Sequence, residues 1–264
     1  MTNLISQALK NNEKKLVTFV TGGDPDFNTS LEIIKTIINN GVDIMEIGMP
    51  FSDPMADGPT IQLSSNRAIS KGIDLENIFS LAAEAKKIKN NLPIILMGYY
   101  NLILYFGIKK FVKKCKENGV DGLIIVDLQP DEDEDLINEL KKNEIDLIRL
   151  ITPTTDEQRL KLILNNASGF LYYVSVMGIT GQKSADLNEL KKSVAFIKKH
   201  TNLPVVPGFG IKNSTDVNNI CKIADGAVVG SSIIKIIEEN LTNKDKMLLE
   251  IDKFSKDLKD GTKV

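Results

Sequence analysis

The sequence contains few of the residues on which several kinds of functional site depend. Its 264 residues include two cysteines, Cys115 and Cys221, and one histidine, His200. Two thiols far apart in the chain make neither a disulfide framework nor a metal cluster, so we expect both to be reduced. The formal net charge is only -2, from 33 Lys and Arg against 35 Asp and Glu. Without a strong charge of one sign, nucleic acid and anionic membranes are poor candidate partners.

Long uninterrupted hydrophobic runs are also missing. The segment Asn90–Ile108 carries no charge, but Pro93, Gly98 and Gly107 interrupt it, so a membrane-spanning helix is not expected there. Residues Met1–Lys15 show the pattern of a short amphipathic helix without the apolar core of a signal peptide. We therefore expect a cytoplasmic protein.

Short apolar segments recur along the whole chain and alternate with segments of helical period. The eight candidate strands are Leu16–Val20, Val42–Ile47, Pro93–Met97, Leu123–Val126, Ile145–Ile151, Phe170–Val174, Val205–Pro207 and Ala227–Val229. Nearly continuous apolar runs are typical of parallel strands that are buried on both faces. The rhythm predicts an α/β fold, a single (β/α)8 TIM barrel with an extra N-terminal helix, as one domain over residues 1–264. A doubly wound sheet is the alternative.

In such a barrel the functional side chains lie at the carboxyl ends of the strands and in the loops that follow. None of the eight strand-to-loop junctions begins with a lysine, so a Schiff-base lysine has no evident position. His200 precedes the seventh strand and is expected at the opposite end of the barrel. This placement argues against histidine catalysis and against a histidine-rich metal site.

The remaining candidates for acid–base chemistry are carboxylates. Glu46 is a single charge near the end of an apolar strand, where burial would raise its pKa toward the range of a general acid. The loop 49–60 that follows contains Asp53 and Asp57 among three prolines, which limit its freedom. The alternative reading is that Glu46 is a solvated strand-end residue and that Asp53 or Asp57 only caps the next helix.

Glycines after the last strands indicate a phosphate site. Gly208 and Gly210 follow the seventh strand, and Gly230 with Ser231 follows the eighth and opens a helix. Free backbone N–H groups and a helix N-terminus at this place suit a dianion, although tight turns would also explain these glycines. The segment 178–183 after the sixth strand is a candidate lid.

The stretch Glu46-Ile47-Gly48-Met49-Pro50-Phe51-Ser52-Asp53-Pro54-Met55-Ala56-Asp57-Gly58-Pro59-Thr60-Ile61-Gln62 resembles the signature of the tryptophan synthase alpha chain family. Further matches, in the order that the family has them and spread over nearly the whole chain, are residues 19–25, 178–181, 208–211 and 230–231. The resemblance implies cleavage of indole-3-glycerol phosphate to indole and glyceraldehyde 3-phosphate. It also implies a beta chain that holds pyridoxal phosphate and receives the indole, in an alpha2beta2 tetramer, with no cofactor in this chain.

The resemblance also implies roles for individual residues. Glu46 would protonate the indole ring carbon that bears the side chain, and Asp57 would bond the indole N–H and stabilise the positive indolenine tautomer. The positions that match the indole wall are Phe19, Tyr99 and Tyr172, those that match the phosphate seat are Gly181, Gly210, Gly230 and Ser231, and Thr180 matches the lid residue that closes against Asp57.

The chain departs from the family pattern at two places. Asp127 is followed by Leu128-Gln129-Pro130 where the family often has a proline-rich run, which bears on partner contacts at this loop. Val176 stands where some members carry arginine, and we assign it no role. The charge-free segment Tyr99–Ile108 has two readings, core packing or an exposed apolar patch against the beta chain.

Three other functions remain as alternatives. Another phosphosugar barrel, such as an epimerase or indole-glycerol phosphate synthase, would share the late glycines but would be expected to carry histidines and a metal, or a catalytic lysine, at its strand ends. A catalytically silent barrel that activates a partner is disfavoured by the presence of both Glu46 and Asp57. A free-standing lyase would differ only in releasing its indole.

Overall fold

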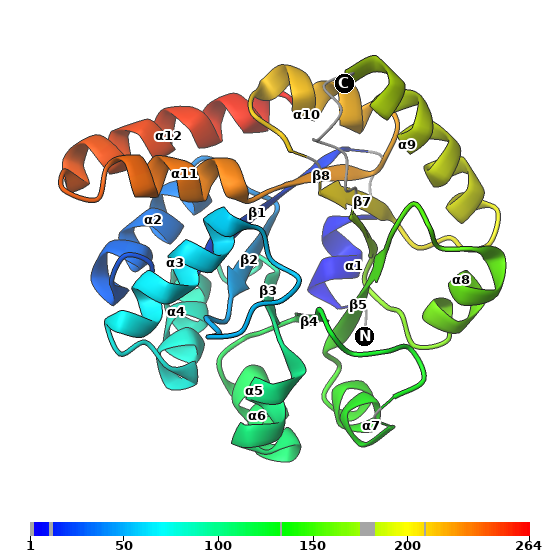
Figure 1. Ribbon diagram of the computed structural model, residues 1–264, viewed down its shortest axis with the longest axis horizontal. Coiled ribbons are helices and arrows are strands. Elements are labelled where there is room, and N and C mark those ends of the chain that lie inside the picture. The colour runs from blue at the N-terminus through cyan, green and yellow to red at the C-terminus, as the bar shows by residue number, and fades with distance from the viewer. Residues whose placement is uncertain (1–2, 11–12, 133, 175–182, 209) are drawn as a thin grey trace.

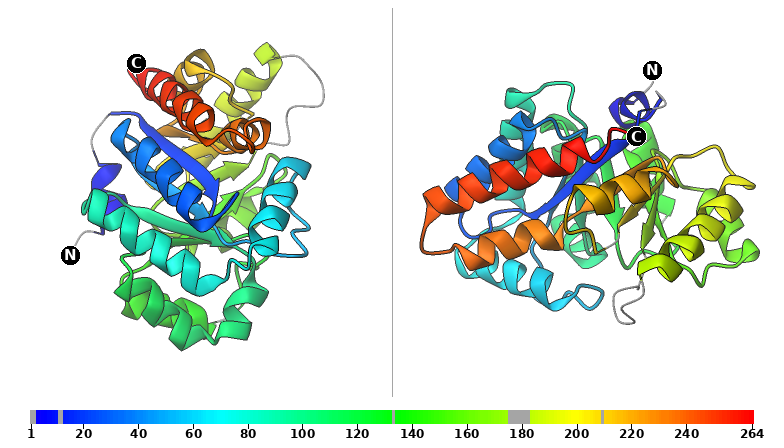
Figure 2. Two further views of the ribbon diagram at one scale, coloured as in Figure 1. Left: turned by 90° about the vertical axis from the view of Figure 1, so that its left-hand side faces the viewer. Right: turned by 90° about the horizontal axis from the view of Figure 1, so that it is seen from above.

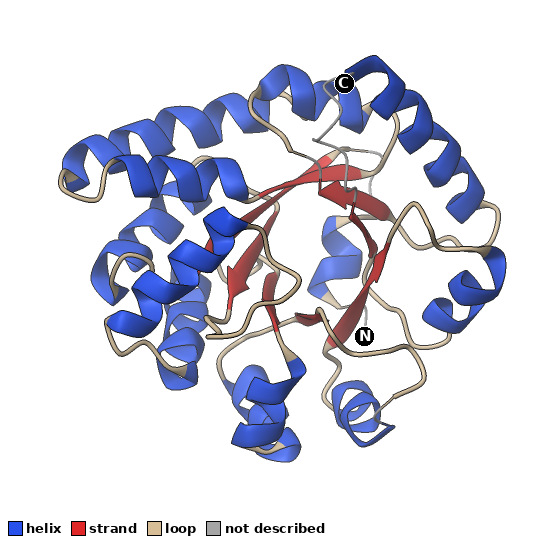
Figure 3. Cartoon of the chain, viewed as in Figure 1, coloured by secondary structure: helices blue, strands red, loops and turns tan. Residues whose placement is uncertain are grey.

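The chain forms a closed barrel of parallel strands, as a computed structural model shows for residues 3–10, 13–132, 134–174, 183–208 and 210–264. The strands are β1 (Lys15–Thr21), β2 (Ile44–Gly48), β3 (Ile94–Gly98), β4 (Gly122–Ile125), β5 (Asp146–Ile151), β6 (Leu171–Val174), β7 (Val205–Gly208) and β8 (Gly226–Val229). All eight predicted strands are confirmed, with bounds that differ by at most two residues. Since β8 pairs with β1 and closes the ring (Figure 3), the doubly wound alternative is wrong.

Helices surround the ring of strands (Figure 1). In the described part of the chain they are α1 (Leu4–Ala8), α2 (Phe27–Asn39), α3 (Pro59–Ser70), α4 (Leu75–Ile88), α5 (Tyr100–Phe106), α6 (Ile108–Glu117), α7 (Glu134–Lys142), α8 (Glu157–Leu164), α9 (Lys183–Lys198), α10 (Ser214–Cys221), α11 (Ser231–Glu239) and α12 (Lys244–Asp260). The predicted N-terminal helix is confirmed as α1, which occupies only Leu4–Ala8 of the predicted segment Met1–Lys15, and Lys15 is already the first residue of β1.

Helix α1 covers one end of the barrel and leaves the other end open for function. Its fully buried Ile5 packs against inward-facing residues from the strands, among them Val17, Ile44 and Phe170. In the left view of Figure 2, α1 and the loop before α3 lie on opposite sides of the molecule. Alternate residues of a strand point to the same face, so Phe19 and Glu46 lie one inward layer above Val17 and Ile44.

The two cysteines, the histidine and the uncharged segment, none of which was predicted to carry catalysis, lie outside the cavity end of the barrel or inside its regular elements. Cys115 and Cys221 are buried and unpaired, and burial raises the pKa of the Cys221 thiol to about 11. His200 follows α9 and its Nδ1 lies 3.0 Å from the carbonyl oxygen of Phe196, ahead of β7 and away from the strands' carboxyl ends. The uncharged segment Asn90–Ile108 contains β3 and α5. Among the described helices, none has the length and apolarity needed to span a bilayer.

Candidate functional site

Most of the predicted site residues line one cavity at the open end of the barrel. The cavity measures about 220 Å³, and its walls include these predicted residues: Phe19, Glu46, Asp57, Tyr172, Gly210, Gly230 and Ser231. Tyr99 lies next to it, in a small adjoining pocket that it shares with Phe19 and Asp57. Thr180 and Gly181, together with Val176, fall outside the described residues. The structure thus brings together residues that are up to 212 positions apart, from Phe19 to Ser231.

Glu46 is the most unusual group in this cavity. It lies on β2 opposite Phe19 of β1, and its exposed fraction is 0 %. Neither carboxyl oxygen has a hydrogen-bond partner within the described part of the chain. Burial, and after it the negative charge of Asp57, raises the pKa of Glu46 to about 8. The reading of Glu46 as a solvated strand-end residue is wrong, and the group holds a proton at neutral pH.

Asp57 lies in the loop between β2 and α3 and is only partly exposed. Burial raises the pKa of its carboxyl group, and a hydrogen bond with the Tyr99 side chain opposes that increase. The loop is held by short backbone bonds, from Met55 N–H to Asp53 O at 2.8 Å and from Asp57 N–H to Pro54 O at 3.0 Å. The residue at the N-cap of α3 is Gly58, which makes no side-chain cap bond. The alternative that Asp53 or Asp57 caps this helix is therefore wrong.

Two aromatic side chains and two glycines shape the cavity wall. A methyl group on Gly48 would lie 2.7 Å from the Phe19 ring, and one on Gly208 would lie 2.4 Å from Tyr172 Oη. Glycine at these two strand positions therefore lets the rings of Phe19 and Tyr172 lie where they do, beside Glu46. Burial, then the charges of Glu46 and Asp57, raises the pKa of Tyr172 well above its usual value, so its hydroxyl stays neutral.

The N-terminus of α11 lines the same cavity. Gly230 occupies the N-cap position and offers no side-chain cap, and Ser231 is the first helical residue. Gly210 comes from the β7–α10 connection and has a φ of +24°, a backbone angle that favours glycine. Uncapped N–H groups at a helix N-terminus attract anions, because the helix dipole adds to the hydrogen bonds.

Several lining residues were not anticipated. Met97 and Val174 face inward from the ends of β3 and β6, and Ile61 reaches the cavity from the first turn of α3. An apolar residue at a strand end carries no chemical signal in the sequence, and only the strand alternation could have identified Met97 and Val174. Among the described residues, no group of three metal-binding side chains is present.

The fold and the cavity together define a class of protein: a (β/α)8-barrel enzyme with a protonated carboxyl group, a second carboxylate and a helix N-terminus facing one cavity. Over residues 5–263 the chain matches the family model described as tryptophan synthase alpha chain. The chain belongs to this family, whose members catalyse the lyase half-reaction of tryptophan synthase.

Individual relatives agree with this assignment. A tryptophan synthase alpha chain from Petrotoga mobilis is 46% identical over 97% of this chain and 98% of its own length. The crystal structure of tryptophan synthase subunit alpha from Legionella pneumophila is 32% identical, with a TM-score of 0.91 over 99% of both chains. A solved structure from Aquifex aeolicus is 37% identical, with a TM-score of 0.88 over 98% of this chain and 99% of that one.

Proposed function

We propose that this chain cleaves indole-3-glycerol phosphate to indole and glyceraldehyde 3-phosphate, with Glu46 as the acid–base residue and Asp57 as the electrostatic partner of the indole nitrogen. The observation that carries the proposal is the buried carboxyl group of Glu46, which lies in the same cavity as Asp57, has a pKa of about 8 and has no hydrogen-bond partner among the residues that the structure describes. A group with such a pKa can donate a proton near neutral pH and take one back.

The proposed step balances within the substrate and Glu46. The carboxylic acid of Glu46 donates its proton to the indole ring carbon that bears the glycerol side chain. The resulting indolenine nitrogen is positive and accepts the electron pair of the breaking carbon–carbon bond. The carboxylate of Glu46 then takes the proton from the side-chain hydroxyl, which becomes the aldehyde. Asp57, as an anion, stabilises the positive nitrogen through its N–H.

The remaining cavity residues would position the two ends of the substrate. Phe19 and Tyr172 offer apolar ring surface beside Glu46, and Tyr99 lies next to Asp57, which suits a planar indole. Gly210, Gly230 and Ser231 would hold the phosphate at the start of α11, where the N-cap residue Gly230 makes no side-chain cap bond. Thr180 and Gly181 would complete the enclosure, as the family resemblance implies.

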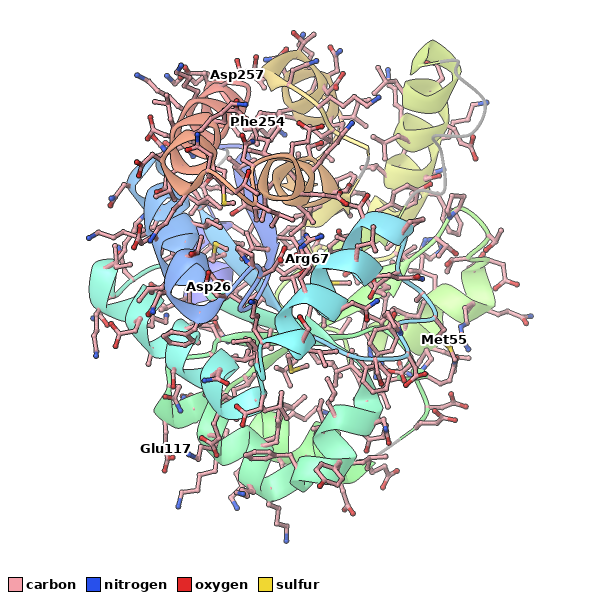
Figure 4. All side chains as sticks on the ribbon, turned by 60° about the vertical axis from the view of Figure 1, so that its left-hand side comes forward. Asp26, Met55, Arg67, Glu117, Phe254 and Asp257 are labelled. Atoms are coloured by element: carbon pink, nitrogen blue, oxygen red, sulfur yellow. The ribbon has the colours of Figure 1, made fainter. Side chains whose placement is uncertain are left out.

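We further propose that this enzyme works in the cytoplasm with a beta chain that holds pyridoxal phosphate and receives the indole, as an alpha2beta2 tetramer. Large apolar side chains are exposed around the open end of the barrel: Met55 at 86%, Leu104 at 50% and Tyr105 at 94%. Figure 4 shows Met55 at the outer edge of the loop before α3. We call these three residues the apolar rim; large exposed apolar side chains on neighbouring loops and helices are typical of a protein interface.

A groove beside this rim has room for a partner segment. It measures about 620 Å³ and runs between Leu104 and Ile108 on one side and Asp135 and Glu139 of α7 on the other. The loop with Leu128-Gln129-Pro130 precedes α7, so the departure from the family pattern lies close to this groove. The groove supports the interpretation that part of the segment Tyr99–Ile108 contacts the beta chain. Tyr99 and Ile103 of the same segment are buried and belong to the core.

The test is the release of indole from indole-3-glycerol phosphate by the purified chain, with and without a beta chain. We expect slow cleavage by the chain alone and a large increase when the beta chain is added. Fast cleavage that the beta chain does not change would favour a free-standing lyase. An absence of cleavage in both conditions would contradict the proposed function.

A further inference from the structure

The hydroxyl group of Tyr99 joins the loop between β2 and α3 to the end of β3. Tyr99 follows β3 directly and is only 3 % exposed. Its Oη accepts a hydrogen bond from Ala56 N–H at 3.0 Å, and its hydroxyl also bonds the carboxylate of the next residue, Asp57. Its ring stacks on Phe51 with 5.2 Å between centroids. Tyr99 therefore contacts this loop at three points, on both sides of its exposed turn.

The chemistry of a phenol gives these two hydrogen bonds a direction. A tyrosine hydroxyl has one proton and can also accept. Because Ala56 N–H can only donate, Oη must be the acceptor in that bond, and its proton is free to point at Asp57. A hydroxyl that accepts one hydrogen bond becomes a stronger donor in the next. The order Ala56 N–H, Tyr99 O–H, Asp57 carboxylate is thus the one that satisfies every group.

We propose that Tyr99 is a positioning residue, which holds Asp57 ionised and oriented in the cavity in addition to forming part of the wall. This inference rests on the proposed role of Asp57. Burial favours the neutral acid of Asp57, and a hydrogen bond donated to the carboxylate favours the anion. An aspartate that has to stabilise a positive indole nitrogen must be the anion when substrate arrives.

The groups around Tyr99 keep it a donor. Asp57 faces it from the loop after β2, and Asp127 faces it from the end of β4, where its Oδ1 accepts the Tyr100 N–H at 2.8 Å. Glu46 of β2 and Tyr172 of β6 are the other titratable groups in the adjoining cavity. Burial is the main cause of the raised pKa of Tyr99, and both aspartates add to it. The phenol therefore stays protonated over the whole working pH range.

The test is Tyr99→Phe in the full enzyme, assayed with the beta chain. This change keeps the ring and its stacking on Phe51 but removes the hydroxyl proton. We expect kcat to fall about tenfold and the acidic limb of the pH profile of kcat/KM to move up by about one pH unit, because the pKa of Asp57 rises. The basic limb, which Glu46 sets, should not move.

Tyr100→Phe is the matched control. The Tyr100 hydroxyl is buried one residue further along and has no hydrogen-bond partner among the described residues. Its removal should leave kcat and both limbs within about twofold and 0.2 pH units of the wild type, since a bond that is not made cannot be lost. An equal shift of the acidic limb in both variants would overturn the inference, because it would indicate that loss of either hydroxyl disturbs the packing around the site in the same way.

Two further results separate this inference from the proposed function. In an Asp57→Asn background, Tyr99→Phe should no longer move the acidic limb, since the group that titrates has gone. If Asp57→Asn impairs turnover but Tyr99→Phe leaves the acidic limb in place, Tyr99 is only a wall residue and the inference fails alone. If Asp57→Asn turns over at the wild-type rate, the proposed function of Asp57 fails first.

Discussion

Arg67 binds Asp24 through two parallel hydrogen bonds, from Nε to Oδ1 at 2.8 Å and from Nη2 to Oδ2 at 2.9 Å. The Asp24 carboxyl is fully buried, whereas the Arg67 side chain is 20% exposed. The pair joins the loop after β1 to α3, and the hydroxyl oxygens of Thr21 and Ser64, 2.5 Å apart, join the last residue of β1 to the same helix. Figure 4 shows Arg67 on α3, the helix that begins just after Asp57.

We predict that Arg67→Met lowers the free energy of unfolding by about 3–5 kcal/mol, because it leaves a buried carboxylate without its cation. The double variant Asp24→Asn with Arg67→Met should lose less free energy of unfolding than Arg67→Met alone, because it leaves no unpaired carboxylate. Urea denaturation measures both. The control is Lys235→Met, which breaks the exposed pair with Glu239 on α11 and should change stability by less than about 0.5 kcal/mol. Equal losses in Arg67→Met and the control would contradict this role.

The pH dependence of stability tests the state of Glu46. Its pKa is about 8 in the folded protein and 4.5 for an ordinary glutamate, so between these values only the folded chain keeps the proton. Folding stability from this group therefore decreases as pH rises through that window, by at most about 1.4 kcal/mol per unit. The Glu46→Gln variant lacks this pH dependence. Its free energy of unfolding should therefore increase relative to that of the wild type as the pH rises from 5 to 8. Parallel stability curves would show that Glu46 titrates normally.

Ser231→Asp separates phosphate binding from helix stability. A carboxylate in the first turn of α11 interacts favourably with the positive end of the helix dipole and should stabilise the fold by about 0.3–1 kcal/mol. The same charge repels a phosphate group, so the affinity for glycerol 3-phosphate should fall about tenfold or more. Calorimetric titration measures the affinity, and Ser231→Ala, which keeps the backbone N–H groups and adds no charge, is the control. Unchanged affinity in Ser231→Asp would place the phosphate elsewhere.

The apolar rim predicts how the partner docks. Tyr105 is 94% exposed on α5, so Tyr105→Ala removes no core contact. We expect weaker association with the beta chain, by about tenfold or more, and unchanged cleavage by the free chain. Leu249→Ala is the control, since Leu249 is 53% exposed on α12, which packs on α2 and α11 and lies away from α5 (Figure 1). Equal affinities of the two variants would remove Tyr105 from the interface.

The strands were predictable from the sequence for a physical reason. A strand of a closed parallel barrel is buried on both faces, so segments such as Ile94–Gly98 are apolar throughout and stand out from the helices. Glu46 was predictable because it is the one charge in β2 and lies near the end of that strand. The family resemblance pointed to the other predicted cavity residues, but not to Ile61, Met97 or Val174.

The contacts that organise the site were not predictable in this way. The bond from Ala56 to Tyr99 and the pair of Arg67 with Asp24 each join residues 43 positions apart, and nothing in their local sequence marks them as partners. The end of the loop had two readings in the sequence, because Asp57 before Gly58-Pro59 also has the sequence of a helix cap, and only the structure shows that Gly58 is the N-cap residue. In the fold its side chain bonds Tyr99 instead. Long-range contacts of this kind need the closed barrel itself.

The most direct test of the account is the rate of indole release by Glu46→Gln with saturating indole-3-glycerol phosphate and beta chain, compared with Asp57→Asn. Glutamine keeps the shape of the buried acid but cannot transfer a proton, so we predict a loss of at least about a thousandfold, with the affinity for glycerol 3-phosphate unchanged. Asp57→Asn should lose less, because an amide can still accept a bond from the indole N–H. Cleavage by Glu46→Gln within tenfold of the wild-type rate would contradict the central claim.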